Sequence, residues 1–217
     1  MKNSEQLMQY HDLIAGIVAA LEARDPYTGC HSMRVADMSV QLCNLLGLPE
    51  DTTTVIHIAA HLHDIGKIGI EDSILRKPGR LTQKEWQVIQ SHAEIGCLIL
   101  RKVECFSGIA QIVLHHHERW NGTGYPAGLK ANDIPFGSRI IAVADSIDAM
   151  MSSRSYRNSM TSEQCRAQIE VNIGAMYDPQ IAKVALENWN TIVESRNDFN
   201  ADEISEYCTL FTTEQRG

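Results

Sequence analysis

The sequence predicts an all-α domain, and three observations support this fold class. Apolar residues recur at helical spacing in most segments between residues 4 and 193. No segment alternates apolar and polar residues over the roughly four to eight positions of a half-buried strand. Capping signals and turn residues separate the helical segments. With 217 residues, 44% of them hydrophobic, the chain is long enough to bury a sizeable core.

Three amphipathic helices are predicted in the first third of the chain. The first covers about residues 4–24 and is broken at Asp25-Pro26. The second carries the apolar positions of residues 35–46 and ends at Gly47. The third spans about residues 51–64 and leads into a short loop that we expect two glycines to make flexible.

The remaining helices are predicted by capping signals and by periodicity. The longest turn-rich segment, residues 118–136, interrupts them, and such a long loop in a compact domain is usually functional or mobile. The periodic segments are 92–103, 107–117 and 140–147, and the capping signals are Thr82–Glu85, Thr161–Gln164 and Asp178-Pro179, the last starting a helix to about Val193. The tail from Asn197 is polar, with at most a short helix near residues 202–209.

Composition narrows the functional classes. A net charge of −8 excludes a general nucleic-acid binder, so an anionic ligand requires a local basic patch or metal ions. The N-terminus has no signal-peptide pattern, and no apolar run approaches the roughly 20 residues of a membrane span. We therefore expect a cytoplasmic protein without membrane segments. The six cysteines are scattered and are predicted to be free thiols: Cys30, Cys43, Cys97, Cys105, Cys165 and Cys208.

The pair His63-Asp64 is the first candidate for a functional site. Imidazole and carboxylate are ligands of borderline divalent metals such as iron, manganese, nickel and zinc. Because a carboxylate has two oxygens, Asp64 can bridge two ions. Three residues later, Lys67 supplies a positive charge that suits a phosphate oxygen.

Other His and Asp residues stand at predicted helix ends or inside apolar helices. Asp145 lies within the apolar run 140–147, where an unpaired carboxylate would be very costly. A metal ion would partner this carboxylate and the imidazoles together, and the number of ligands exceeds the needs of one ion. The number of ligands therefore predicts a two-metal site. The further candidates are His31, His92, His115, His116 and His117.

Some histidines are ambiguous on spacing alone. His57 and His61 are four residues apart, share a helix face and have a spacing that can bind zinc. However, His61 and His63 cannot point the same way on a helix, and only His63 is followed by an aspartate. Periodicity does not choose two of His115, His116 and His117. His11 is predicted to be structural or solvated.

Taken together, these motifs resemble those of the HD-GYP domains, which are bacterial cyclic-dinucleotide phosphodiesterases within the HD superfamily of metal-dependent phosphohydrolases. The resemblance covers about residues 10–187. The matching stretches are Ala20–His31, Leu62–Ile70, Ser91–Gly96, His116–Pro126, Arg139–Asp145 and Tyr177–Pro179.

The resemblance implies an assignment of the metal ligands, with Asp64 bridging the two ions. His31, His63, Asp64 and Asp145 match the first metal site of the family, and Asp64, His92, His116 and His117 match the second. Some members of the family bind a third metal ion, and they use a glutamate four residues before the first histidine ligand to do so. Because Tyr27 stands at that position here, we expect two metals.

The resemblance also implies roles for residues around the metals. Lys67, Asp64 and Asp145 are expected to carry catalysis, with Lys67 on the scissile phosphate. Arg154 and Arg157 match positions that hold substrate phosphates. Asp148 is expected to orient a metal ligand. Tyr125 is expected to lie beside the site, in the Gly-Tyr-Pro loop that gives the family its name and where partner domains can dock. Asn121 replaces an aspartate that is common in the family, and this change is expected to perturb function without abolishing it.

The expected function is hydrolysis of a 3′-5′ cyclic dinucleotide, with cyclic di-GMP favoured, to pGpG, to GMP or to both. Iron or manganese is favoured as the metal, with nickel or zinc as alternatives. The expected organisation is a phosphohydrolase domain over residues 1–196 and a tail over 197–217, in a monomer or homodimer that binds no DNA or RNA. Two alternatives are a catalytically weak signalling module and a single-metal nucleotidase of the wider superfamily.

Overall fold

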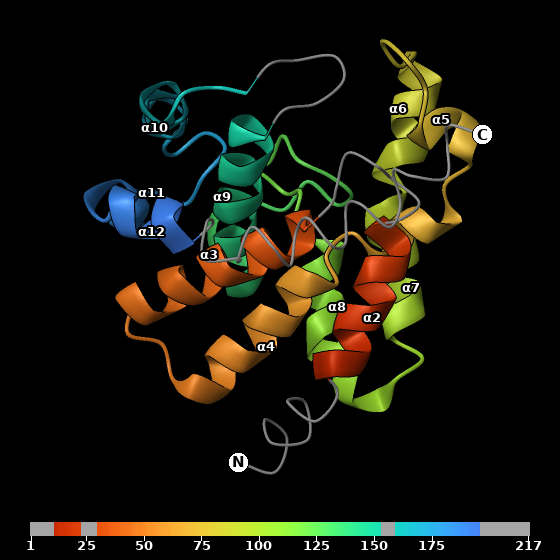
Figure 1. Cartoon of the computed structure of the whole chain (residues 1–217), viewed down its shortest axis with the longest axis horizontal. Coiled ribbons are helices and arrows are strands. Elements are labelled where there is room, and N and C mark those ends of the chain that lie inside the picture. The colour runs from red at the N-terminus through yellow and green to blue at the C-terminus, as the bar shows by residue number, and fades with distance from the viewer. Residues whose placement is uncertain (1–10, 23–29, 153–158, 196–217) are drawn as a thin grey trace, which may run out of the picture.

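A computed structural model describes residues 11–22, 30–152 and 159–195 of the chain (Figure 1). All its regular elements in these ranges are α-helices or short 3-10 helices (η), and no strand occurs there, which confirms the all-α prediction. The elements are α2 (His11–Glu22), α3 (His31–Leu45), α4 (Glu50–His61), η1 (Ile65–Gly69), α5 (Asp72–Leu75), α6 (Gln83–Gln90), α7 (His92–Leu100), η2 (Glu104–Phe106), α8 (Ser107–Leu114), η3 (Ala131–Asp133), α9 (Phe136–Met151), α10 (Ser162–Val171), α11 (Pro179–Glu187) and α12 (Trp189–Ser195).

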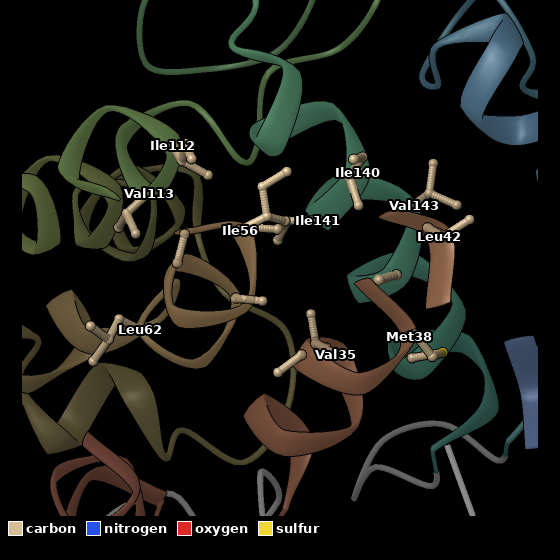
Figure 2. Close-up of a cluster of buried hydrophobic side chains, with 14 of the residues drawn as sticks. Val35, Met38, Leu42, Ile56, Leu62, Ile112, Val113, Ile140, Ile141 and Val143 are labelled. Atoms are coloured by element: carbon tan, nitrogen blue, oxygen red, sulfur yellow. The ribbon is translucent and has the colours of Figure 1, made fainter. Parts of the chain in front are cut away.

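Helix α3 packs against both α4 and α9, and it lies between these two helices in Figure 1. Helix α4 also packs against α8, and α8 against α7. Figure 2 shows the buried side chains between these helices. Burial of each large aliphatic side chain contributes about 1.5–3 kcal/mol relative to exposure, so these helices form a firm support for any site at their ends. The labelled residues are Val35, Met38, Leu42, Ile56, Leu62, Ile112, Val113, Ile140, Ile141 and Val143.

The capping signals read from the sequence form as predicted. The Thr82 hydroxyl accepts a hydrogen bond from the Glu85 backbone N–H at 3.3 Å, and the Glu85 carboxylate accepts one from the Thr82 N–H at 2.7 Å. Thr161 and Gln164 form the same reciprocal pair before α10. Asp178 Oδ1 accepts the N–H of Gln180 at 2.8 Å at the start of α11.

Several predicted helix ends were wrong by a few residues, and two of these errors affect the candidate site. Helix α4 ends at His61, so His63 and Asp64 lie in a turn after the helix and not in its last turn. Helix α8 ends at Leu114, so the three consecutive histidines also follow their helix. In both places the ligand side chains are carried by a tight turn at a helix C-terminus.

The segment after Asp64 is not the flexible loop that its two glycines suggested. Residues Ile65–Gly69 form the 3-10 helix η1, which packs against α7. A Cβ atom at Gly66 would overlap the carbonyl oxygen of His92 and lie 2.5 Å from the backbone nitrogen of Gly96. Gly66 is therefore required for close approach of two backbones, which joins the turn of Asp64 to the start of α7.

Two further predictions concern the C-terminal part and the cysteines. The helix expected from Asp178 to Val193 is broken at Asn188 into α11 and α12. The predicted tail from residue 197 lies outside the described residues. Five of the six cysteines lie within the described residues, and none of these five takes part in a disulfide bond there. Among the helices in the described ranges, none has both the length and the apolar character needed to cross a membrane.

Candidate metal centre

The candidate ligands lie where several helix ends converge on the middle of α9. His31 is the first residue of α3, and His92 is the first residue of α7. His63 and Asp64 follow α4, and the turn after α8 carries His116 and His117. Asp145 faces these residues from α9, which the apolar core holds in place. Segments that are far apart in the sequence thus deliver imidazoles and carboxylates to one place.

Six of the candidates form two groups of potential ligands. Within each group, one ligand atom from each residue lies within 4.8 Å of the others. In the first group, His31 Nε2 lies 3.4 Å from Asp145 Oδ1. In the second group, the Nε2 atoms of His92 and His116 are 3.3 Å apart. The first group is His31, His63 and Asp145, and the second is His92, His116 and His117.

Asp64 lies between the two groups and turns one carboxylate oxygen toward each. Its Oδ2 atom is 3.4 Å from Nε2 of His63 and 3.9 Å from Nε2 of His31. Its Oδ1 atom is 3.4 Å from Nε2 of His92. This is the arrangement that a bridging carboxylate requires, because each oxygen can serve a different ion.

The hydrogen bonds of the histidine rings fix which nitrogen is available to a metal. The Nδ1 atoms of His63, His92 and His116 lie 2.6–2.7 Å from the backbone carbonyl oxygens of Ala60, Ile89 and Val113, respectively. A carbonyl oxygen only accepts, so each Nδ1 carries a proton, and Nε2 is the nitrogen that can offer a lone pair to a metal.

These lone pairs show that the centre fits a metal. The Nε2 atom of His63 is buried and has no hydrogen-bond partner. The Nε2 lone pairs of His92 and His116 point toward one another across 3.3 Å, which is unfavourable without a cation between them. A divalent ion in each group would satisfy these atoms with the imidazole and carboxylate ligands that zinc, iron and manganese accept.

The first group carries charge. Burial alone would lower the pKa of His31, but hydrogen bonds and ion pairs with Asp145 and Asp148 raise it to about 9. Burial alone would raise the pKa of Asp145, but its bond to His31 holds that pKa far below its usual range. Without metal at neutral pH, the first group is therefore an imidazolium between carboxylates.

The second group is neutral. Burial lowers the pKa of His92, and it lowers the pKa of His116 further, with the neighbouring histidines adding to the effect. Burial likewise lowers the pKa of His117 to about 3. At neutral pH these three rings keep their metal-binding lone pairs. Burial also opposes ionisation of Asp64, but Lys67 and His63 hold its pKa well below the usual range.

Asp148, which the resemblance implied as an orienting residue, lies beside His31. Its Oδ2 atom lies 2.7 Å from Nδ1 of His31, and its side chain is fully buried. Arg34, which sequence reasoning missed, donates from Nε to Oδ1 of Asp148 at 2.6 Å and from Nη2 to Oδ2 at 3.0 Å. The only sequence signal for Arg34 is its position three residues after His31, on the same helix face.

Glu22 is a second residue that sequence reasoning missed. Its two carboxylate oxygens accept the backbone N–H groups of Cys30 and Ser32, each at 2.9 Å. It therefore caps α3 from the end of α2 and steadies the turn on which His31 stands. A cap from a residue eight positions upstream leaves no local pattern in the sequence.

The other predicted site residues are placed as follows. Lys67 Nζ lies 2.6 Å from Oδ2 of Asp64, and the side chain is 20% exposed. The ring of Tyr125 lies over that of His117, with centroids 4.9 Å apart. The amide of Asn121 accepts two hydrogen bonds from Thr123 within its exposed turn. Arg154, Arg157 and Tyr27 lie outside the described residues.

Three of the ambiguous histidines, His57, His61 and His115, lie outside both ligand groups. His57 and His61 share a face of α4, as their spacing predicted, and their Nε2 atoms are 3.0 Å apart. His115 Nδ1 lies 3.6 Å from Glu118 Oε1. The structure thus groups His116 and His117, and not His115, with His92.

Comparison with known proteins places this centre in a family. A family model described as HD domain matches residues 17–181. The chain is 40% identical over 187 residues to a Vibrio cholerae protein named 3′3′-cGAMP-specific phosphodiesterase 2, a match that covers 85% of this chain and 36% of that protein. It is 42% identical over 195 residues to a cyclic di-GMP phosphodiesterase of Thermotoga maritima, with 86% and 52% covered. The chain thus spans about half the length of these relatives, or less.

Solved structures agree with this placement at the level of fold. The cyclic GMP-AMP-specific phosphodiesterase V-cGAP3 of V. cholerae superposes with a TM-score of 0.65 at 19% identity, covering 91% of this chain and 53% of that one. The HD domain of PgpH from L. monocytogenes, solved with cyclic-di-AMP, gives a TM-score of 0.58 at 20% identity, covering 85% and 97%. The family model and the two relatives, each at least 40% identical over about 85% of this chain, show that the chain belongs to the HD domain family, in its HD-GYP branch.

Proposed function

We propose that the chain is a metal-dependent phosphodiesterase that hydrolyses a 3′-5′ cyclic dinucleotide, with cyclic di-GMP as the favoured substrate. The observation that carries this proposal is the position of Asp64, with one oxygen toward each ligand group and Lys67 at 2.6 Å. The names of the relatives support a cyclic dinucleotide as the substrate class.

The ligand set supports two divalent ions, with iron or manganese favoured. Asp64, His31, His63 and Asp145 would hold one ion, and Asp64, His92, His116 and His117 the other. When bound, the ions supply Lewis acidity, which makes water acidic enough to attack phosphorus near neutral pH. A mixture of imidazole and carboxylate ligands, without thiolate, suits these metals.

The chain's own residues hold the substrate and balance its charge. Lys67 is partly exposed beside Asp64, so its ammonium can reach a phosphoryl oxygen and stabilise the negative charge that grows there. Water adds to phosphorus, the bond to the ribose 3′-oxygen breaks, and the first product is linear pGpG. A second hydrolysis would yield GMP. The buried imidazoles around the centre hold their ring orientation through backbone carbonyls, so little reorganisation is needed.

A product assay tests this function. The purified protein, loaded in turn with iron, manganese or nickel, is incubated with cyclic di-GMP, cyclic GMP-AMP and cyclic di-AMP, and the nucleotides are separated. We expect pGpG and GMP from cyclic di-GMP, faster than turnover of the other two. The absence of hydrolysis under all three metals would reject the enzyme and favour a binding module.

Two variants make the assay specific to the proposed centre. Asp64→Asn retains the size of the side chain but weakens both metal positions, and it should reduce product to background. Asp133→Asn is the matched control, because this carboxylate is exposed and lies outside both ligand groups. Faster hydrolysis of cyclic GMP-AMP would contradict the proposed preference for cyclic di-GMP, but it would still support hydrolysis of a cyclic dinucleotide.

A further inference from the structure

His57 and His61 lie one helical turn apart in the last part of α4 and belong to neither ligand group of the centre. Their Nε2 atoms face each other at 3.0 Å, and their ring centroids are 4.7 Å apart. His61 is buried and His57 is partly exposed, so the pair is reachable from solvent on one side. The mechanism proposed above uses neither ring.

The separation of these two nitrogens matches a chelate. Metal–nitrogen bonds of about 2.0–2.1 Å place two imidazole nitrogens on one ion about 2.9–3.4 Å apart, for bond angles between octahedral and tetrahedral. Histidines at i and i+4 on a helix reach this geometry without a change in the backbone. Little movement of His57 or His61 would therefore be needed to bind an ion.

The position of the pair in the helix also favours a cation. The C-terminal end of an α-helix carries partial negative charge, and α4 ends at His61. One divalent ion shared by both rings places positive charge at this end.

We propose that His57 and His61 form a separate binding site for one imidazole-seeking divalent ion, such as Ni²⁺, Zn²⁺ or Cu²⁺. Affinity for divalent ions rises from manganese and iron toward nickel and copper, so these late metals are the ions expected at a site that offers imidazole ligands alone. An ion bound there clamps the last turn of α4, directly before the turn that delivers His63 and Asp64 to the centre. This site does not depend on the proposed phosphodiesterase activity.

Metal counting on the whole chain tests the proposal. Protein loaded with Mn²⁺ is dialysed against Ni²⁺, and total manganese plus nickel per chain is measured by mass spectrometry. We expect the wild type to hold about one ion more per chain than His57→Gln, because glutamine can keep a hydrogen bond to His61 but removes a ligand. Ni²⁺ should also raise the melting temperature of the wild type more than that of the variant.

Controls separate the pair from the centre. His57→Ala should lose the same ion, and circular dichroism confirms that each variant is folded before its metals are counted. His115→Gln is the matched histidine control, since His115 belongs to neither ligand group, and it should keep the wild-type count. A folded His57→Gln or His57→Ala variant with the same total metal content as the wild type would overturn the proposal.

Discussion

The two ligand groups on either side of Asp64 lie next to each other but are built in different ways. The first, with His31 and Asp145, is held by ion pairs that extend to Asp148 and Arg34. The second, with His92 and His116, is held by backbone carbonyls and by burial. The first group therefore keeps a proton until a metal displaces it, whereas the second presents neutral lone pairs. Metal ions bound to the two groups would thus face different competition from protons.

The largest effect should come from removing what the two groups share. Asp64→Asn should reduce metal content from about two ions per chain to less than one, because one carboxylate faces both groups. Elemental analysis after dialysis measures this, with Asp133→Asn as the control. Loss of only a single ion would show that Asp64 is a ligand in one group alone and is not shared by both.

Single-ligand variants should separate the groups. His92→Ala should empty the second group and leave the first filled, and His31→Ala should do the reverse, so that each retains about one ion per chain. Titration of metal-free protein with Mn²⁺, followed by calorimetry, counts the sites that remain. If either variant loses both ions, the two groups bind metal as one unit and not independently.

Weakening the ion-pair support should affect the first group alone. Arg34→Met leaves the buried Asp148 carboxylate without its two guanidinium bonds, and supports of this kind typically affect metal affinity by about 10–100-fold. Arg34→Lys should recover part of the loss, since it restores charge but not the paired geometry. Arg80→Met, at an exposed position, is the matched control. Equal weakening of both sites would contradict this account.

The smallest effect is the number of protons released on binding. In the metal-free protein the pKa of His31 is about 9, so at pH 7 the ring is charged and an ion in the first group must expel a proton. The second group should release none, because the pKa values of its rings lie below neutral. Calorimetry in two buffers of different ionisation enthalpy measures the number of protons released. We expect about one proton per chain in the wild type and none in His31→Ala. No buffer dependence in the wild type would show that His31 is already neutral.

Helix boundaries show where sequence reasoning was least reliable. Periodicity predicted α4 and α8 but extended each by about three residues, because apolar or histidine residues continue the pattern into the following turn. The break at Asn188 was missed because apolar residues on both sides keep helical spacing. Capping boxes at Thr82 and Thr161 were predicted correctly, since their hydrogen bonds join residues only three apart.

Local sequence patterns did not predict how Gly66 and Arg34 support the candidate centre. Glycine at position 66 suggested a flexible loop, yet it permits the backbone of η1 to touch that of α7. Arg34 looked like an ordinary helical residue, but its partner Asp148 lies 114 positions away. Such contacts depend on which helices pack against each other, and local sequence patterns do not show this.

The sequence by itself determined the all-α class, the ligand types at helix ends, and the resemblance to HD-GYP domains that the family match confirmed. These follow from short-range rules, because periodicity, caps and motifs involve residues close along the chain. The resemblance also implied how the candidate ligands divide into two groups. Only the tertiary structure decided which oxygen of Asp64 faces each group, and how His57 and His61 meet outside the centre. Those outcomes depend on packing of α3, α4 and α9, whose core fixes positions and angles that local pattern does not encode.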